Sequence, residues 1–517
     1  MHLLDANKNR IELEPLPEPR RRDAARASGD ALFRESPLAK VERAFFEIGR
    51  TRGPAAVVRG ALASPGPRPV AFRESRTGLV RTFRREIVIR FEAKTAPARR
   101  AAILRTLGLE ERRRNRFVAQ QIIAADKSRT RGGEELLEVA NECASLDEVV
   151  FATPNFVSQY RRGAAGPPAA QWHLDNKARA AGQLLGEDVD ALGAWKLTRG
   201  RRAIVVAVLD DGVDIEHPLL ARNAWRDPSK TARDRVGRDF FLPDDHPDHF
   251  NPRPKKFRYP YDEMPGNDIH GTPCAGVVAA AGPAAYGIAP GSRVLAVKIF
   301  HADDFAEDER VADAIRYAAT RADVLSCSWS GGSSPDVQLA LRDVRRLGRK
   351  GRGSPVFCAT GNDSLPGRPG RVGFPASDPN AIGVGASTDQ AQLAPYSNVG
   401  QEVDFVAPSS GGVLGIFTTD VSLPGRGFNV GTAAAGGKDG LCTNAFGGTS
   451  SATPLAAGIA ALVLSAAPRL GTDEVRDILR ATADKIGAGY DARGFSTRFG
   501  YGRVNAAKAV SQAKERG

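Results

Sequence analysis

Residues 203–212 read Ala-Ile-Val-Val-Ala-Val-Leu-Asp-Asp-Gly. The first seven carry no polar side chain, and an unbroken apolar run of this kind is typical of a strand buried on both faces of a parallel sheet. The run ends in two carboxylates, Asp210 and Asp211. Because open α/β sheets bind ligands at the carboxyl ends of their strands, an aspartate at this position is well placed for function.

Two other stretches place a polar side chain at the start of a helix of small residues. Residues 270–280 read His-Gly-Thr-Pro-Cys-Ala-Gly-Val-Val-Ala-Ala, and residues 445–458 read Ala-Phe-Gly-Gly-Thr-Ser-Ser-Ala-Thr-Pro-Leu-Ala-Ala-Gly. In the second stretch, paired glycines allow a tight turn. Ser450 then lies in the first helical turn, where free amides and the helix dipole favour negative charge. A serine becomes a nucleophile only beside a base that a third group orients.

The groups that supply this chemistry follow one another as Asp210, His270 and Ser450, which is the chain order of subtilisin and not of chymotrypsin or the α/β-hydrolases. With these motifs the sequence resembles the subtilase family of serine peptidases. That family has Asp-x-Gly after a strand, His-Gly-Thr at a helix start and Gly-Thr-Ser-x-Ala-x-Pro around the nucleophile. The resemblance implies that His270 is the base and that Asp210 orients it.

The resemblance covers about residues 170–510, through Gln-Trp-His-Leu at 171–174, Ala-Thr-Gly-Asn at 359–362 and Phe-Gly-Tyr-Gly-Arg-Val-Asn-Ala at 499–506. It implies an α/β fold with a doubly wound, mostly parallel central sheet. The doubled aspartate and the Cys-Ala-Gly after the histidine resemble the kexin-like branch. Residues 328–334 lack the acidic run that this branch carries for basic P1 side chains.

Further site residues follow from the resemblance. Asn362 matches the asparagine that binds the oxyanion, and residues 328–330 match the edge beside which a substrate binds as an extended strand. Residues 372–375, Val-Gly-Phe-Pro, resemble the open S1 wall of subtilisins. The expected substrate-binding residues are Ser328, Trp329, Ser330, Gly373, Asp211 near S2, and Asp363 at the rim of S1.

Each assignment has an alternative. Asp210 could cap a turn, and Asp211 could be the functional carboxylate in its place. Asn362 could be an ordinary turn asparagine. The register of the motifs favours the residues named above over their competitors, which are His217, His246, His249 and His301 for the base and Thr449 and Ser451 for the nucleophile.

The residues ahead of the peptidase-like part show an alternation of strands and helices. Its order is β-α-β-β-α-β-like, and it resembles the ferredoxin-like α+β propeptide that inhibits subtilases. A template of this kind suits a parallel α/β domain, which folds slowly because its contacts are non-local. The expected elements are strands at 69–73, 86–91, 116–123 and 148–157 and helices at 98–107 and 134–143.

We therefore predict four parts: a basic N-terminal arm at 1–65, which need not be fully ordered, an inhibitory propeptide-like domain at 66–160, a linker at 161–170, and a peptidase domain at 171–517. The linker is polar and flexible in composition, and we expect a self-processing cut between Tyr160 and Ala170. The alternative is an ordinary interdomain linker.

Charge and hydropathy limit the partners. The net charge is +13, but residues 1–168 hold 32 Lys and Arg against 21 Asp and Glu, so the peptidase-like part is nearly neutral. This distribution argues against nucleic acid as a partner. The first 30 residues contain no continuous apolar segment of the signal-peptide type and no membrane-spanning run follows, so we expect a cytoplasmic enzyme.

We expect no required cofactor, and the cysteines and acidic loop residues are the candidates considered for disulfides and for a structural metal. Five cysteines cannot all pair, and buried free thiols are expected. Many subtilases bind structural Ca²⁺ through an acidic residue nine places after the catalytic aspartate, but Leu219 stands there. Asp244, Asp245 and Asp248 offer carboxylates in a loop, so a structural Ca²⁺ site is an open expectation and no metal ligand is assigned.

Three functions fit these features. The first is a serine endopeptidase made as a self-processing zymogen that its own propeptide inhibits. The second is a pseudo-protease or peptide-binding module whose cleft stays covered by its pro region. The third is a basic interaction protein that uses residues 1–65. A complete triad with Asn362 favours the first, and the near-neutral peptidase part argues against the third.

Overall fold

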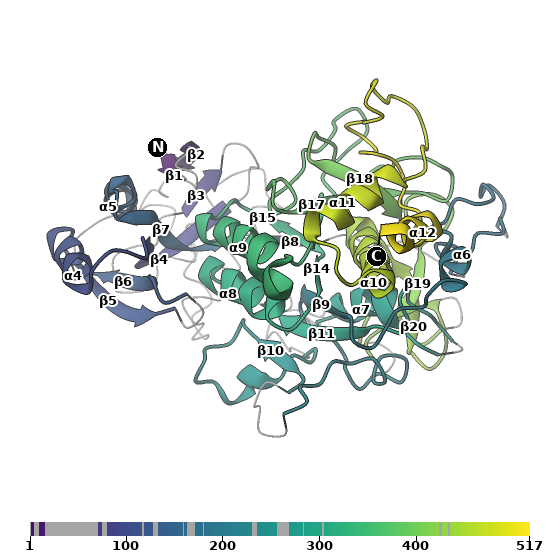
Figure 1. Cartoon of the computed structure of the whole chain (residues 1–517), viewed down its shortest axis with the longest axis horizontal. Helices are drawn as coiled ribbons and strands as arrows, with labels where there is room; N and C mark the ends of the chain where they lie inside the picture. Colours follow the sequence, from purple (N-terminus) through teal and green to yellow (C-terminus); the bar gives the residue numbers. More distant parts are fainter. Residues whose placement is uncertain are drawn as a thin grey trace, which may run out of the picture. The chain divides into compact units, whose positions relative to one another are not determined.

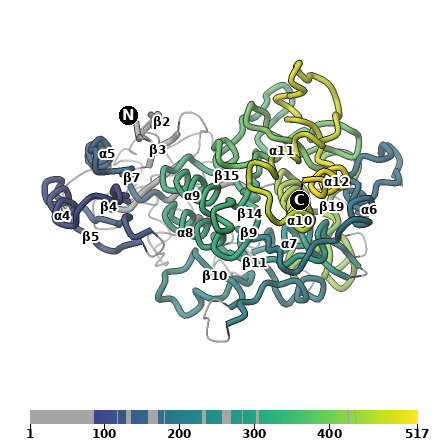
Figure 2. The backbone as a smooth tube through the Cα atoms, in the orientation of Figure 1, coloured from purple at the N-terminus to yellow at the C-terminus, as the bar shows by residue number. Residues whose placement is uncertain are grey.

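The computed structural model describes residues 2–4, 10–15, 71–74, 80–115, 118–127, 133–158, 160–162, 171–178, 180–229, 235–255, 268–282, 284–301, 304–422, 426–432 and 435–516. The chain divides into two compact units. The first consists of Met1–Tyr160, Asp303–Glu309 and Gly332–Leu339, and the second of Arg161–Ala302, Arg310–Gly331 and Ala340–Gly517. Figure 1 labels the elements of both units, and Figure 2 traces their backbone.

The first unit contains an antiparallel sheet in which the neighbouring strands are β7, β4, β6 and β5. The chain order is β4, α4, β5, β6, α5, β7, which is the β-α-β-β-α-β order expected for this part, although the predicted elements included one strand between the two helices where the structure has two. Strands β1 to β3 extend the sheet beyond β4. The bounds are β1 His2–Leu4, β2 Arg10–Pro15, β3 Ala71–Glu74, β4 Val80–Phe91, α4 Pro97–Thr106, β5 Leu109–Arg114, β6 Gln121–Asp126, α5 Gly133–Ser145 and β7 Val149–Ser158.

The sheet of this unit buries alternate residues of β4 on opposite faces. Ile87 and Ile89 pack with Leu137 of α5 in one apolar core, while Val88 packs with Leu339 in another. The prediction of one strand at 116–123 was wrong in its bounds. Strand β5 was missed because its residues Glu-Glu-Arg-Arg-Arg are polar and exposed, as suits the edge of a sheet.

The second unit is built on a parallel sheet of seven strands in the order β10-β11-β9-β14-β16-β17-β18. This sheet and its helices confirm the predicted doubly wound α/β fold. The strands are β9 Val205–Asp210, β10 Gly237–Asp239, β11 Arg293–Lys298, β14 Val324–Cys327, β16 Val356–Ala359, β17 Ile382–Ser387 and β18 Val403–Pro408.

The order of this sheet reverses at β9. After β9 the chain forms β10 and β11 on one side of it and then crosses to β14 on the other side. A reversal of this kind leaves a crevice at the carboxyl ends of the two central strands, where ligands of α/β proteins bind.

The remaining helices are α6 Ala191–Trp195, η3 Pro247–Phe250, α7 Gly271–Ala279, α8 Asp308–Ala319, α9 Pro335–Gly351, α10 Gly448–Ala466, α11 Thr472–Ala481 and α12 Ala506–Arg516. The short strands are β8 Tyr160–Arg162, β12 Phe300–His301, β13 Asp304–Phe305, β15 Trp329–Gly331, β19 Ile416–Thr419 and β20 Cys442–Phe446.

Helices α7 and α10 form the centre of the second unit. Every residue of α7 is buried, and so is α10 from Gly448 to Ser465. A side chain at Gly276 would overlap the hydroxyl of Thr419, which shows why α7 is built of small residues. By length and composition α10 is the one described helix that could cross a membrane, but 94% of its apolar window is buried inside the protein.

One of the predicted domain boundaries coincides with a boundary between the compact units of the structure. The N-terminal stretch of the first unit ends at Tyr160, where we placed the end of the propeptide-like domain. Most of the predicted arm at 1–65 lies outside the described residues, as do residues 163–170 of the predicted linker. The four-part division therefore stays a prediction.

Candidate active site

Asp210 is the last residue of β9 and lies at the reversal of the sheet. The chain turns immediately after it, because Gly212 has a φ of +119° and a Cβ there would lie 2.9 Å from the carbonyl oxygen of Pro252. An L side chain would be strained in this conformation. The turn directs the chain away from the sheet and leaves the carboxylate of Asp210 facing α7.

The carboxylate of Asp210 binds the imidazole of His270. The His270 Nδ1 atom lies 2.9 Å from Oδ1 and 3.0 Å from Oδ2 of Asp210, and the two side chains are 3% and 1% exposed. This contact makes Nδ1 the protonated nitrogen and Nε2 the basic one. Nε2 is buried and has no hydrogen-bond partner in the described part of the chain. The imidazole thus has the orientation that a general base requires.

Asp211 holds the start of α7. Its two carboxylate oxygens accept the backbone amides of His270, at 2.9 Å, and Gly271, at 2.6 Å. A Cβ on Gly271 would overlap the carbonyl oxygen of Gly212, so the close approach of helix and turn requires glycine. Asp211 is fully buried and acts as the anion at the N-terminus of α7. Its contacts therefore position His270, and the predicted substrate-binding role stays a prediction.

Ser450 lies in the first turn of α10, after Gly448 with its φ of +71°. Its hydroxyl donates to the carbonyl oxygen of Ser328 at 3.2 Å, and the Ser328 hydroxyl donates to the carbonyl oxygen of Ser450 at 3.0 Å. Ser328 directly follows β14, so this reciprocal pair places Ser450 beside the second central strand. The competing hydroxyls point elsewhere, because Thr449 bonds Asn362 and Ser451 bonds Gly448 and Ser409.

Cys274 brings the three predicted groups together. Its sulfur lies 3.8 Å from Oδ2 of Asp210, 3.9 Å from Nδ1 of His270 and 3.7 Å from the carbonyl oxygen of Ser450. Burial, and secondly the charge of Asp210, raise the pKa of the Cys274 thiol well above its usual value. The group is therefore a neutral thiol that packs under the site, as the sequence predicts, and not a rival nucleophile. All five cysteines are free and buried.

Asn362 lies beside the residue before the nucleophile. Its Oδ1 atom accepts the backbone amide of Thr449 at 2.8 Å and the Thr449 hydroxyl at 3.1 Å. Because the amide oxygen is taken up by these two donors, the Nδ2 group is the part of Asn362 that can donate to a ligand. The side chain is partly exposed, as a ligand-binding group must be.

The comparison with protein families decides what this arrangement belongs to. The model described as the subtilase family matches residues 201–502, which include all three groups. The chain belongs to the subtilase family. A calcium-dependent protease of Trichormus variabilis is 34% identical over 80% of this chain, and the kexin of Saccharomyces cerevisiae is 28% identical over 66%. The chain spans 61% of the first relative and 39% of the second.

Solved structures support the same fold. Fervidolysin from Fervidobacterium pennivorans, described as a keratinolytic enzyme related to subtilisin, superimposes with a TM-score of 0.60 over 85% of this chain and 62% of its own. A serine protease of Aeromonas sobria in complex with its chaperone superimposes with a TM-score of 0.55. The identities are 18% and 22%, so these likenesses concern the fold.

The predicted substrate edge of this subtilase is strand β15. It forms a two-stranded sheet with β8, whose last two residues begin the second unit. The side chain of Trp329 is buried, with its indole nitrogen donating to the carbonyl oxygen of Leu209 at 2.9 Å. Only the backbone of Trp329 is therefore available to a substrate, which narrows the prediction made for this residue.

The other predicted substrate-binding residues surround this edge. Gly331 donates its amide to the carbonyl oxygen of Phe374 at 2.7 Å, which sets residues 372–374 beside β15. A Cβ on Gly373 would lie 3.1 Å from that of Ser330, so the glycine leaves room between the two segments. Asp363 is exposed and its carboxylate accepts the side-chain amide of Asn398 at 3.1 Å.

The remaining candidate histidines of the subtilase have other contacts. His217 bonds the carbonyl oxygen of Leu441, His249 bonds Arg238, and His246 accepts the amide of Asp248. His301 also faces a carboxylate, that of Asp268, at 3.3 Å. None of these contacts involves Asp210 or Ser450, so of the candidate histidines His270 is the one whose ring bonds Asp210.

Sequence reasoning missed two buried charged residues at this site, Lys298 and Asp268. Lys298 is the last residue of β11 and bonds both the carbonyl oxygen of Asp211 and the carboxylate of Asp268. A signal was present in the sequence, because Lys298 is the single charged residue that interrupts the apolar run Val-Leu-Ala-Val-Lys-Ile-Phe at its carboxyl end. It was overlooked because lysine fits no triad motif.

Proposed function

We propose that this subtilase is a serine endopeptidase that hydrolyses peptide bonds through Asp210, His270 and Ser450 and an acyl-enzyme intermediate. The observation that carries the proposal is the buried Asp210 to His270 contact of 2.9 Å, which leaves Nε2 as the basic nitrogen, with Ser450 packed against the same Cys274 sulfur. Asp–His pairs of this kind orient the base that activates a serine.

The proposed reaction begins with a proton transfer. The Ser450 hydroxyl exchanges its bond to Ser328 for one to Nε2 of His270, which takes the proton as the oxygen attacks the substrate carbonyl. Asp210 stabilises the imidazolium that forms. His270 then gives the proton to the leaving amine, and a water activated by the same nitrogen hydrolyses the acyl-enzyme.

Negative charge develops on the carbonyl oxygen during the attack. The side-chain amide of Asn362 and the backbone amide of Ser450 are the proposed donors to it. Thr449 fixes the orientation of Asn362 before substrate arrives, because it occupies the amide oxygen with two donors. A donor that is already oriented stabilises the transition state without a cost of reorganisation.

Asn362→Ala is expected to lower kcat about 10²–10³-fold and to change KM little, because the donor bonds the oxyanion more strongly than the ground-state carbonyl. The measurement is the steady-state hydrolysis of a fluorogenic peptide. Asn398→Ala, which removes a nearby asparagine that bonds Asp363, is the comparison variant. An Asn362→Ala enzyme with an unchanged kcat would remove Asn362 from the proposed mechanism.

The proposed substrate binds as a strand beside β15, with main-chain hydrogen bonds supplying affinity. The pairing of β15 with β8 supports this mode, because Arg161 and Arg162 of β8 lie within the second unit beside that edge. We propose that the chain cuts itself between Tyr160 and Ala170, directly after this strand. Asp363 and Asp211 remain proposed contributors to a preference for basic side chains.

The N-terminal part is the proposed inhibitor. Within the first unit, Arg113 forms an ion pair with Glu309, and the side chain of Gln121 donates to the buried carboxylate of Asp336 at 2.7 Å. Glu309 and Asp336 lie inside the residues that match the family, whereas Arg113 and Gln121 precede them. These contacts would keep the N-terminal part bound without a covalent link. The alternative is a peptide-binding module that this part covers permanently.

Calcium is a further question, because two relatives are named calcium-dependent proteases. The acidic loop does not fit a calcium site. Asp244 lies 3.9 Å from the guanidinium of Arg238, and Asp248 lies 3.4 Å from the ammonium of Lys255, so both carboxylates face cations. Within the described ranges the one close group of potential metal ligands is Asp210, His270 and Cys274. No step of the proposed reaction involves a metal.

The proposal is tested by incubating the full chain with a fluorophosphonate probe and following its size and its label with time. We expect a wild-type chain that separates into two fragments near residues 160–170, with the label on the larger one. A cut, labelled enzyme distinguishes the endopeptidase from a peptide-binding module, which would be neither cut nor labelled.

A further inference from the structure

Three adjacent strands of the parallel sheet end in a row of buried charges. In the register of β10, β11 and β9, Asp239 is paired with Lys298, and Lys298 with Asp210. The backbone continues the pairing past the strand ends, because Ile299 donates its amide to the carbonyl oxygen of Asp210 at 2.8 Å. All three charged side chains are at most 1% exposed. Lys298 is thus the immediate neighbour of the proposed catalytic carboxylate in the sheet.

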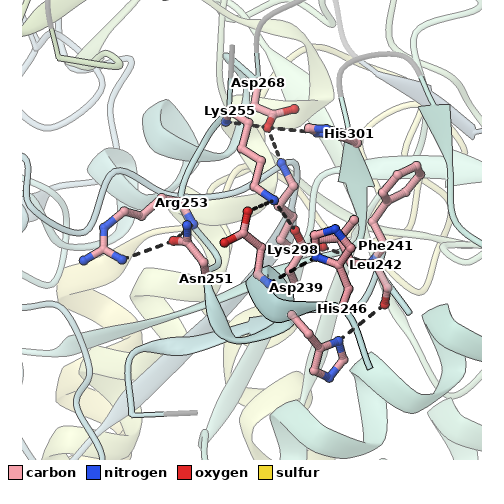
Figure 3. A network of polar contacts seen from close by, with 12 residues as sticks. Asp239, Phe241, Leu242, His246, Asn251, Arg253, Lys255, Asp268, Lys298 and His301 are labelled. Carbon is pink, nitrogen blue, oxygen red and sulfur yellow. Dashed lines mark hydrogen bonds and ion pairs between the residues drawn. The ribbon is translucent and has the colours of Figure 1, made fainter. Parts of the chain in front are cut away.

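The ammonium of Lys298 joins the two segments that carry the Asp210 and His270 pair. It donates to the carbonyl oxygen of Asp211 at 2.9 Å and to Oδ2 of Asp268, two residues before His270. Figure 3 shows Lys298 between Asp239 and Asp268, with Lys255 and His301 around them. The same Oδ2 atom accepts the backbone amide of Lys255 at 2.7 Å.

These contacts complement those of Asp211. The Asp211 carboxylate, at the end of β9, accepts the first amides of α7. Lys298 forms the second link, because its ammonium donates to the carbonyl oxygen of Asp211 and to the carboxylate of Asp268, two residues before His270. Two independent links therefore fix the end of β9 against the start of α7. Since the base and its orienting carboxylate belong to these two segments, their mutual geometry depends on the links.

Stability alone does not account for this lysine. The ammonium of Lys298 and the carboxylate of Asp268 are both completely buried. The desolvation of two such charges offsets most of their attraction, and apolar residues of similar volume are often as stabilising. A fixed geometry at a reacting centre, by contrast, has a large kinetic value, because a displacement of about 1 Å can cost about 10²-fold in rate.

We propose that Lys298 and Asp268 are positioning residues that hold the Asp210 and His270 pair in its reactive arrangement. The inference rests on the proposed peptidase function and adds two residues to it. Both residues are buried, so their removal is expected to act on the chemical step and to leave binding nearly unchanged.

The test uses Lys298→Met and Asp268→Asn in the full chain. Methionine keeps the length of the side chain without the charge, and asparagine keeps an oxygen acceptor for the amide of Lys255. Arg476→Met is the control, because Arg476 pairs at 2.7 Å with Asp404, another fully buried carboxylate, which lies on the edge strand β18 and keeps Arg480 as a second partner. Circular dichroism and the melting temperature establish folding, and the rate of fluorophosphonate labelling is measured against probe concentration.

We expect the maximal labelling rate to fall about 10–100-fold for Lys298→Met and the half-saturating probe concentration to change less than about threefold. Arg476→Met is expected to lower the melting temperature and to label at the wild-type rate. The pH profile adds a readout that loss of stability does not move. Labelling requires an unprotonated base, so its rate rises with pH to a plateau.

The titratable groups that the structure sets against the His270 ring are Asp210 from β9 and Cys274 from α7, while Asp211 accepts the His270 amide. Lys298→Met removes a positive charge beside this group and is expected to move the midpoint of the measured profile to higher pH. Asp268→Asn removes a negative charge and moves it to lower pH. Opposite shifts in two variants that both lose stability would support the inference.

The outcomes separate the two proposals. An unlabelled wild type would overturn the peptidase function itself. A labelled wild type with a folded Lys298→Met variant of equal rate and equal midpoint would overturn only the positioning role. If Lys298→Met does not fold, Asp268→Asn and the apolar pair Lys298→Met with Asp268→Leu replace it. Failure of all of them to fold would also contradict the inference, since the pair would then serve general stability.

Discussion

Ser450→Ala is expected to lower peptide hydrolysis about 10⁶-fold, the loss that follows removal of a serine nucleophile from a complete triad. The Ser450 backbone carbonyl contacts the Cys274 sulfur, which also contacts Asp210 and His270, and the Ser450 hydroxyl bonds the carbonyl oxygen of Ser328. Its loss leaves Asn362 and the substrate edge in place, so a small residual rate over water is expected. The measurement is hydrolysis of a fluorogenic peptide with the size of the chain followed in parallel.

Ser451→Ala is the matched control for this variant. The Ser451 hydroxyl is buried one residue further on and bonds Gly448 and Ser409. We expect Ser451→Ala to cut itself and to hydrolyse peptide within a few-fold of the wild type. Equal activity of Ser450→Ala and wild type, or loss of activity in Ser451→Ala alone, would show that the nucleophile has been assigned to the wrong hydroxyl.

Asp210→Asn is expected to lower kcat about 10⁴-fold without unfolding the protein. An asparagine amide at this position can donate to Nδ1 of His270, which would place the proton on Nε2 and remove the base from Ser450. The two contacts of 2.9 and 3.0 Å between the carboxylate and Nδ1 make this tautomer change the direct consequence of the substitution. The measurement is kcat, with circular dichroism as the check on folding.

The neighbouring aspartate provides the comparison. Asp211→Asn retains one oxygen acceptor for the amides of His270 and Gly271, so the start of α7 is disturbed while the tautomer of the imidazole is kept. We expect a loss about 10²-fold or less, in line with a small displacement of the base. A larger loss for Asp211→Asn than for Asp210→Asn would show that Asp211, and not Asp210, is the carboxylate that orients the base.

The sequence predicts this site well wherever a residue type is tied to local chain geometry. The apolar run before Asp210, the glycine turn before Ser450 and the small-residue helices are local patterns, and the structure places them at one sheet reversal around Cys274. The apolar run of β9 indicates a buried parallel strand for the same reason, whereas the doubly wound sheet as a whole is implied by the family resemblance.

Contacts between distant segments could not be predicted in this way. Asp211 stands in a motif, yet only the folded chain shows that its carboxylate is occupied by helix amides. Trp329 matches a substrate edge, but its side chain turns into the core. Lys298 and Asp268 are 30 residues apart, and their pairing depends on the register of β11 against β9.

The most direct test of the account is to identify the residue that a fluorophosphonate labels. The wild-type chain is incubated with the probe, digested, and analysed by mass spectrometry, and the new N-terminus of the larger fragment is sequenced. We predict a single adduct on Ser450 and a cut between Tyr160 and Ala170. An adduct on another residue, or an uncut chain without any adduct, would contradict it.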